Sequence, residues 1–364
     1  DLDTMQIQDT GLRFPPKGRK GTYAYSVGDK IHSAMILGNG KFAKTLLLGH
    51  GSHIWWDDGG WPFDARIFQG GALYSYKPAS KKLECLGIPV QRNTIHGLFG
   101  GDGFAAGYSL PDNHFFSFDY ETGEMCDFGK ISAYCCHSLG CVGKKVFGVY
   151  RRSMGEQRGD AVVANNSGAF LFFYDHDARQ LERTEILIDP LETNIRFNSG
   201  MDSWVSTPAG LIGGRVDGTL FLLDTERLAI EELCYAIEPT HPSLSREQIR
   251  KLGGSRCTAI NGSERITSME MLDKNHIIGT AGFPIMHVFV YDLAARRSFD
   301  LGPVNPDTDM CYFHDMVITR PDAKNIRLAL AETDSGLANL HILNMPAEKI
   351  CQLTSQEELL ANPI

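Results

Sequence analysis

Short apolar segments recur along the chain, and each ends in a polar residue followed by a tight turn. Three or four apolar or aromatic residues lead to this polar hinge residue, and a second strand-like run follows the turn. The six segments are LYSYK at 73–77, FFSFD at 115–119, LFFYD at 171–175, LFLLD at 220–224, VFVYD at 288–292 and LHILN at 340–344. Short apolar runs rich in aromatic and β-branched residues and bounded by turn residues predict β-strands.

A second hairpin precedes each of these segments. One example is IHGLFGGDGFAAGY at 95–108, in which two strand-like runs flank a Gly-Asp-Gly turn. The repeating unit therefore has four short antiparallel strands and recurs about every 53 residues, which is the size of a β-propeller blade. Because each blade buries its faces only against its neighbours, we expect an all-β fold with residues 1–364 in a single propeller domain.

The number of blades follows from the length of the repeat. Six units are explicit, and 364 residues divided by the mean spacing gives about 6.9. The N-terminal residues before the first unit and the C-terminal residues after the last one could pair and close the ring as a seventh blade. The sequence therefore favours seven blades, with six as the alternative.

Polar residues occupy one equivalent position near the start of the first strand of each unit. They are His32, His96, His137, Asp202, Thr267 and His314. First strands line the central channel of a propeller, where a core position would carry an aliphatic residue, and buried imidazoles need hydrogen-bond partners. We therefore expect this set to bind or act on a ligand.

The longest insertions fall between the second and third strands of the first and third units, on the same face. They carry His50, His53, Trp55, Trp56, Tyr150, Arg151 and Arg152. Long loops in a compact fold are usually functional or disordered. The two tryptophans suit either sugar stacking or a loop core, and the two arginines either an anion site or exposed surface. The pair His50 and His53 is weak evidence for a metal site.

Composition and charge limit the classes of binding partner that we expect. Glycine is the excess residue, with 38 of 364, and the net charge of −9 makes nucleic acid an unsuitable partner. We expect no membrane partner, because no apolar run approaches the roughly 18 residues of a span. The chain starts at Asp1 rather than Met. We expect a monomer that is secreted or periplasmic, with its leader removed.

The sequence lacks the motifs of several enzyme classes. The chain has no Gly-x-Ser-x-Gly for a serine nucleophile, no Cys-x-x-Cys and no cofactor motif. Carboxylates for glycoside hydrolysis are present at Asp57, Asp58, Asp202 and Asp315, but the repeated position is richer in histidine than in carboxylates.

The stretch NTIHGLFGGDGFAAGYSLPDNHFFSFDYETGEMCDFG at 93–129 resembles the propeller-fold polysaccharide lyases, which include the ulvan lyases and the rhamnose–glucuronate lyases. In that family one His opens a first strand and another precedes an aromatic third strand about 20 residues later; here these are His96 and His114. A Tyr and an Arg from the next blade complete the family's site, and Tyr150 with Arg151 or Arg152 supplies those residue types. The resemblance implies β-elimination on an acidic oligo- or polysaccharide that contains uronic acid.

The resemblance also implies roles. His96, His114, Tyr150 and Arg151 would be catalytic. The substrate-binding set would be His32, His50, His53, Trp55, Trp56, His137, Arg152, Asp202 and His314. The sequence establishes no cofactor, and a divalent cation (Ca, Mn or Zn) stays open. Two alternatives remain: a metal-dependent lyase resembling oligogalacturonate lyase, in which histidines near the axis hold the ion, and a non-catalytic propeller that binds carbohydrate or protein.

Overall fold

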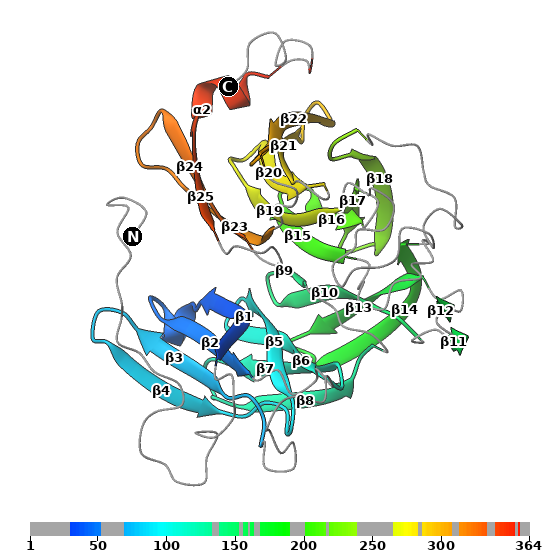
Figure 1. The fold of residues 1–364 in the computed structure, drawn as a ribbon. Helices are drawn as coiled ribbons and strands as arrows, with labels where there is room; N and C mark the ends of the chain where they lie inside the picture. Colours follow the sequence, from blue (N-terminus) through cyan, green and yellow to red (C-terminus); the bar gives the residue numbers. More distant parts are fainter. Residues whose placement is uncertain are drawn as a thin grey trace. The chain divides into compact units, whose positions relative to one another are not determined.

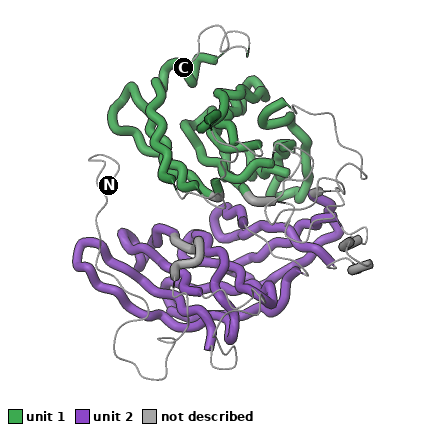
Figure 2. Tube along the Cα trace, viewed as in Figure 1, with its two compact units in different colours: residues 1–8, 157–162, 193–364 green, residues 9–156, 163–192 purple. Residues whose placement is uncertain are grey.

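The protein has six antiparallel sheets of the β-propeller type, and it divides into two compact units of three blades each (Figures 1 and 2). A computed structural model describes residues 30–51, 69–132, 138–152, 156–158, 161–163, 168–189, 201–215, 218–238, 265–282, 286–307, 313–332, 339–353 and 356. Unit 1 comprises residues 1–8, 157–162 and 193–364, and unit 2 comprises residues 9–156 and 163–192. Each blade is a meander in which consecutive strands pair, as the repeat predicted.

Unit 2 holds the first three blades. The first blade contains β1 (Lys30–Leu37), β2 (Leu46–Gly51), β3 (Leu73–Lys77) and β4 (Lys82–Gly87), with a short 3-10 helix η2 (Gly40–Phe42). The second contains β5 (Thr94–Gly101), β6 (Phe104–Leu110), β7 (His114–Asp119) and β8 (Met125–Lys130). The third contains β9 (Gly140–Val142), β10 (Lys145–Tyr150), β13 (Ala169–Asp175) and β14 (Gln180–Asp189). A two-stranded hairpin, β11 (Glu156–Arg158) and β12 (Ala161–Val163), is inserted between β10 and β13, where the sequence predicted the insertion.

Unit 1 holds the other three blades. The fourth contains β15 (Met201–Thr207), β16 (Gly210–Arg215), β17 (Thr219–Asp224) and β18 (Ala229–Tyr235). The fifth contains β19 (Ile266–Met271), β20 (His276–Ala281), β21 (His287–Asp292) and β22 (Arg297–Pro303). The sixth contains three described strands, β23 (Phe313–Thr319), β24 (Asn325–Glu332) and β25 (Leu340–Pro346), followed by helix α2 (Ala347–Cys351).

The structure has six blades, the alternative number, and the preference for seven was wrong. That preference counted the residues after the last hinge as part of another blade, but the chain enters helix α2 directly after β25. Dividing the whole length by the mean spacing also counted the residues before β1, which begins at Lys30, as part of the repeat. The predicted pairing of the two chain ends involves residues outside those that the structure describes.

A glycine on the second strand faces a phenylalanine on the third in four of the blades. The pairs are Gly107 with Phe116, Gly148 with Phe172, Gly213 with Phe221 and Gly279 with Phe289. A Cβ atom on Gly107 would lie 2.6 Å from Cζ of Phe116, and one on Gly279 would lie 2.5 Å from Cζ of Phe289. The missing side chain leaves room for the ring to cover the neighbouring strand. These pairs account for part of the glycine excess.

Two of these rings, Phe116 and Phe289, belong to buried clusters that join adjacent blades. In unit 2, Leu47 and Leu73 of the first blade pack with Ile95, Leu98 and Phe116 of the second. In unit 1, one buried cluster joins the fourth and fifth blades and another joins the fifth and sixth. Burial of this kind is the main favourable contribution to folding.

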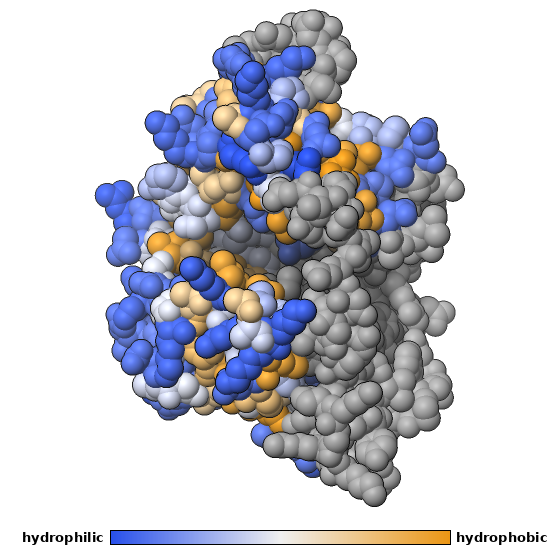
Figure 3. Space-filling view, turned by 90° about the vertical axis from the view of Figure 1, so that its left-hand side faces the viewer, coloured by the Kyte–Doolittle hydropathy of each residue, from blue (hydrophilic) through white to orange (hydrophobic). Residues whose placement is uncertain are grey.

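The described surface is mostly hydrophilic, with apolar residues interspersed, as the face in Figure 3 shows. The large apolar side chains that are exposed are Leu37, Leu187, Tyr235, Val317 and Leu340. Within the described residues, no helix is long and apolar enough to span a lipid bilayer.

Replacing Gly107 by alanine tests the glycine–phenylalanine pairing. The added Cβ would lie 2.3 Å from the carbonyl oxygen of Gly97 as well as against Phe116, so the strand must shift. We expect a loss of about 1–3 kcal/mol, which is typical of overpacking, and a Tm lower by a few degrees in thermal unfolding. Gly100→Ala is the control, because its nearest neighbour is 3.7 Å away. Equal Tm values for the two variants would contradict this account of the packing.

Candidate functional site

The repeated polar position coincides with a β-bulge in the first strand of five blades. The residues at the bulges are His32 in β1, His96 in β5, Asp202 in β15, Thr267 in β19 and His314 in β23. In β5, for example, Ile95 pairs with Ser109 and Gly97 pairs with the next residue, Tyr108, so His96 is the extra residue of the bulge. Bulges re-aim side chains and are frequent beside active sites. The alignment of these positions is therefore a structural feature of the blades, whereas His137 lies outside the described residues.

His96 and His114 occupy neighbouring positions in the second blade. The bulge at His96 faces Tyr108 and Ser109 on β6, and Tyr108 in turn pairs with Phe115, the residue after His114. The two histidines therefore lie in one row across the sheet, separated by one strand. Strands in a sheet are about 4.8 Å apart, so their backbones are on the order of 10 Å apart.

His114 is oriented by a carboxylate. Its Nδ1 lies 2.9 and 3.0 Å from the two carboxyl oxygens of Asp127, on the adjacent strand β8. Because a carboxylate only accepts hydrogen bonds, Nδ1 carries a proton, and in the neutral ring the lone pair is then on Nε2. The backbone N–H of Gly129 also donates to Asp127, at 2.8 Å. The imidazole is about a quarter exposed.

The same pair recurs in the fifth blade. There, Nδ1 of His287 lies 2.9 Å from a carboxyl oxygen of Asp300, and Gly302 donates to that carboxylate. Asp127 was missed in the sequence. The recurrence of Asp-Phe-Gly at 127–129 and Asp-Leu-Gly at 300–302, each following a histidine that opens a third strand, is the signal that could have found it. The pairs also hold the third and fourth strands together.

A buried amide supports the turn that leads into β7. The side-chain oxygen of Asn93 accepts hydrogen bonds from the hydroxyl of Ser109, at 3.2 Å, and from the backbone N–H of Asp112, at 3.0 Å. Its amide nitrogen donates to the carboxylate of Asp112 at 2.9 Å. Asn93 thus ties the start of β5 to the end of β6, and it stabilises the turn just before His114.

The end of strand β2 in the first blade lies close to the start of β5, next to His96. His50, at the end of β2, is 1% exposed, and its ring meets Tyr74 edge-on at 6.2 Å. A Cβ on Gly71 would lie 2.1 Å from the carbonyl oxygen of His50 and 2.9 Å from the backbone nitrogen of Ile95, so the two strands approach each other closely there. The other residues predicted for this insertion, His53, Trp55 and Trp56, lie outside the described residues.

Hydrogen bonds that involve the backbone also connect the third blade to the part of the second blade that carries His114. The N–H of Ile131 donates to the carbonyl of Asn113, beside His114, and the next residue, Ser132, accepts from the N–H of Arg151 at 3.0 Å. Arg151 is 6% exposed. We call the site defined by His50, His96, His114 and Arg151 the unit 2 edge.

Tyr150 and Arg152 are held by partners of their own. The hydroxyl of Tyr150 donates to the carbonyl of Thr184 at 2.8 Å, and the side chain is buried. The guanidinium of Arg152 is exposed, pairs with Glu185 and lies 4.1 Å from the ring centre of Phe170. Both side chains thus contact β14, and Arg152 also contacts β13.

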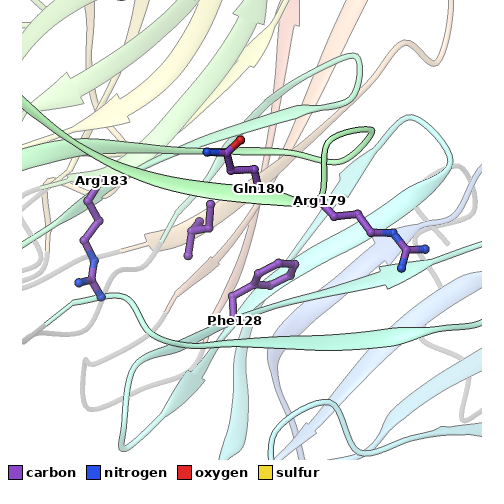
Figure 4. Close-up of a pocket in the computed structure, with 5 residues that line it drawn as sticks. Phe128, Arg179, Gln180 and Arg183 are labelled. Carbon is purple, nitrogen blue, oxygen red and sulfur yellow. The ribbon is translucent and has the colours of Figure 1, made fainter.

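An open hollow of about 550 Å³ lies between the outer strands of the second and third blades (Figure 4). Its lining includes Phe128, Arg179 and Arg183, and Figure 4 shows the ring of Phe128 between the two arginines. Arg179 pairs with Glu124 at 2.7 Å, and Arg183 donates to the carbonyl of Lys130. Because both guanidinium groups already have partners, we do not include the hollow in the site.

Of the three bulge residues in unit 1, the side chains of Asp202 and His314 lie outside the described set. Thr267 is buried and its hydroxyl lies 3.0 Å from that of Thr280. The charge of Asp315, on β23, also acts on Glu270, on β19. Burial and then the negative charge of Asp315 raise the pKa of Glu270 to about 7.

Metal-ligand atoms gather at one place in the described part of the chain, formed by Asp273, His276 and Cys351. This group lies at the turn between β19 and β20, at the other end of β19 from Thr267.

Comparisons with known proteins show the fold. No protein-family model matches the chain, and no curated protein matches it in sequence. Among solved structures, oligogalacturonate lyase in complex with manganese is similar with a TM-score of 0.50 and 10% identity, over 89% of this chain and 76% of that one. A luciferin-regenerating enzyme is similar with a TM-score of 0.45 and 9% identity, over 88% and 93% of the two chains. At such identities, the likeness to the lyase supports a propeller fold and does not assign an activity.

Glu270→Gln should stabilise the protein in a pH-dependent way. A pKa raised to about 7 means that the folded state resists ionisation, so wild-type stability falls as the pH rises from about 4.5 through 7. The amide cannot ionise, and the variant should gain on the order of 1–2 kcal/mol at pH 8 and nothing at pH 4.5, allowing for partial exposure. Thermal unfolding at several pH values measures this. Glu182→Gln, at an exposed site, is the control; a gain that does not change with pH would contradict the assignment.

Proposed function

We propose that the protein is a polysaccharide lyase that cleaves a uronic-acid-containing glycan by β-elimination at the unit 2 edge. The observation that carries this proposal is the row formed by His96, on its bulge, and His114, oriented by Asp127, on a blade edge that also bears Arg151. Two imidazoles and a guanidinium are the groups that this reaction needs.

The reaction requires one proton to be removed and another to be delivered. A base takes the proton from the sugar carbon next to the carboxylate, and the electron pair forms a double bond to the neighbouring carbon. The bond from that carbon to the 4-linked oxygen breaks, and the oxygen receives a proton from an acid. The negative charge that develops beside the carboxylate must be offset by a cation or by hydrogen bonds.

His114 suits the role of the base. Its Nδ1 proton is directed to Asp127, so Nε2 is the basic atom. The carboxylate holds the ring in one orientation and stabilises the imidazolium that forms when Nε2 takes a proton. Asp127 is then a positioning residue rather than a catalytic one.

His96 would deliver the proton to the leaving oxygen. Its backbone is on the order of 10 Å from that of His114, so two imidazole side chains directed toward a sugar between them could contact both sides of its ring. The buried Asn93 network stabilises the turn between the two positions.

Arg151 is the residue that we assign to the substrate carboxylate. It is attached to the edge through its backbone contact with Ser132, whereas Arg152 pairs with Glu185. Tyr150 directs its hydroxyl to Thr184, so we assign it a positioning role. The partner in this proposal is an acidic oligo- or polysaccharide; the net charge of −9 does not oppose it, because the arginine and histidines act locally.

The activity is tested by incubating the protein with ulvan, gum arabic, glucuronan and pectin fragments and following the ultraviolet absorbance of the unsaturated uronide. We expect turnover on one of these glycans. His96→Ala and His114→Ala should each lower kcat about 10²- to 10⁴-fold, as expected when a proton-transfer group is removed.

His287→Ala is the matched control for His114→Ala, because His287 makes the same contact with Asp300 in the fifth blade. Both variants should lose a similar, small amount of stability, but His287→Ala should retain the wild-type rate. Equal rates for the two variants would remove His114 from the mechanism. Inactivation by a chelator, reversed by manganese, would favour the metal-dependent alternative, and binding without turnover on every glycan would favour a non-catalytic module.

A further inference from the structure

Three potential ligand atoms meet where the fifth blade contacts helix α2. Nδ1 of His276 lies 2.9 and 3.0 Å from the carboxyl oxygens of Asp273, and Sγ of Cys351 lies 3.1 Å from one of those oxygens. The donor atoms of the three residues all lie within 4.8 Å of one another. The cluster joins residues 78 positions apart in the chain, from Asp273 to Cys351.

The backbone holds two of the groups in place. Asp273 accepts hydrogen bonds from the N–H groups of Asn275, at 2.7 Å, and His276, at 2.9 Å, and this fixes the tight turn between β19 and β20. One oxygen of its carboxylate, Oδ1, makes both of these bonds, while the other, Oδ2, receives the thiol. The sequence Asp-Lys-Asn-His at 273–276 therefore places a carboxylate and an imidazole on one side of the turn.

The third group is brought in by apolar packing. Leu272, next to the turn, belongs to the same buried cluster as Met345, Ala347 and Ile350, which lie at and around the start of α2. Cys351 packs against this cluster at the end of the helix. Ligands carried by packed elements keep their geometry, as a metal site requires.

The thiol and the carboxylate already face each other. The thiol of Cys351 donates to Oδ2 of Asp273 across 3.1 Å, so a cation that replaces this proton would lie between the two atoms.

We propose that Asp273, His276 and Cys351 bind one divalent cation of intermediate softness, such as Zn²⁺, and that this cation fastens α2 to the fifth blade. Zn²⁺ accepts sulfur, nitrogen and oxygen ligands at about 2.0–2.3 Å in tetrahedral geometry, which needs donor separations of roughly 3–4 Å. Small movements from the distances above satisfy this, and water fills the fourth position. The thiol loses its proton to solvent on binding, and the imidazole binds through Nδ1 with its proton on Nε2.

The site belongs to unit 1 and shares no residue with the unit 2 edge. It is at the turn end of β19, whereas the bulge at Thr267 is at the start of that strand. The proposed role is structural, so it can hold or fail whatever reaction the protein catalyses.

Cobalt(II) is the probe, added to the full-length protein after treatment with a chelator. We expect one equivalent to produce a thiolate-to-cobalt charge-transfer band in the near ultraviolet and the intense visible bands of tetrahedral cobalt. Zn²⁺ should displace it, and about one proton should be released per metal bound at neutral pH. Absence of the charge-transfer band in the wild-type protein would overturn the proposal without any variant being needed.

Variants then locate the site. Cys351→Ser should abolish the charge-transfer band, and His276→Ala should weaken binding by at least tenfold. Cys126→Ser is the matched control, because its thiol also lies beside a carboxylate, that of Glu124 at 3.7 Å, and it should keep the band. Zn²⁺ should raise the Tm of the wild type and of Cys126→Ser but not that of Cys351→Ser. A band that survives in Cys351→Ser, or is lost in Cys126→Ser, would place the metal elsewhere and overturn the proposal.

Discussion

The packing of a phenylalanine ring over a glycine on the neighbouring strand is the contact on which the blades depend. A four-stranded sheet of this size cannot bury both faces by itself, so each blade relies on the blades beside it. The second strand lies in the middle of this packing, and a side chain at its central position would displace the ring. Four blades solve the problem with the same pair of residues, which accounts for part of the glycine excess.

The same regular packing explains where function can reside. Residues that face a neighbouring blade are committed to the core, whereas residues at strand ends and bulges are not. The bulges in the first strands interrupt the ladder, and in four of the five blades the first residue of the interruption is a histidine or an aspartate. In unit 2, the bulge at His96 lies one strand away from His114, and backbone contacts join this edge to Arg151.

The repeated pattern of the sequence predicted the strands well, because an apolar run, a polar hinge residue and a tight turn are local properties. The repeated polar position in the first strands coincides with bulges in five blades, but the bulges themselves were not predicted. The pattern did not predict the blade number, which depends on how the chain continues after β25. It also missed the partners of the candidate residues. Asp127 lies 13 residues from His114, and the Thr184 carbonyl that holds Tyr150 lies 34 residues away; only the strand register brings each pair together.

The central claim is that His96 and His114 contact the substrate, and the ring signals of the histidines report this directly. The measurement is a nuclear magnetic resonance titration of histidine-labelled protein with the uronate oligosaccharide that shows turnover, using a variant slow enough to hold it, such as Arg151→Lys. The account predicts that the signals of His96 and His114 shift while that of His287 stays in place. Unchanged signals from His96 and His114 at oligosaccharide concentrations that saturate binding would contradict it.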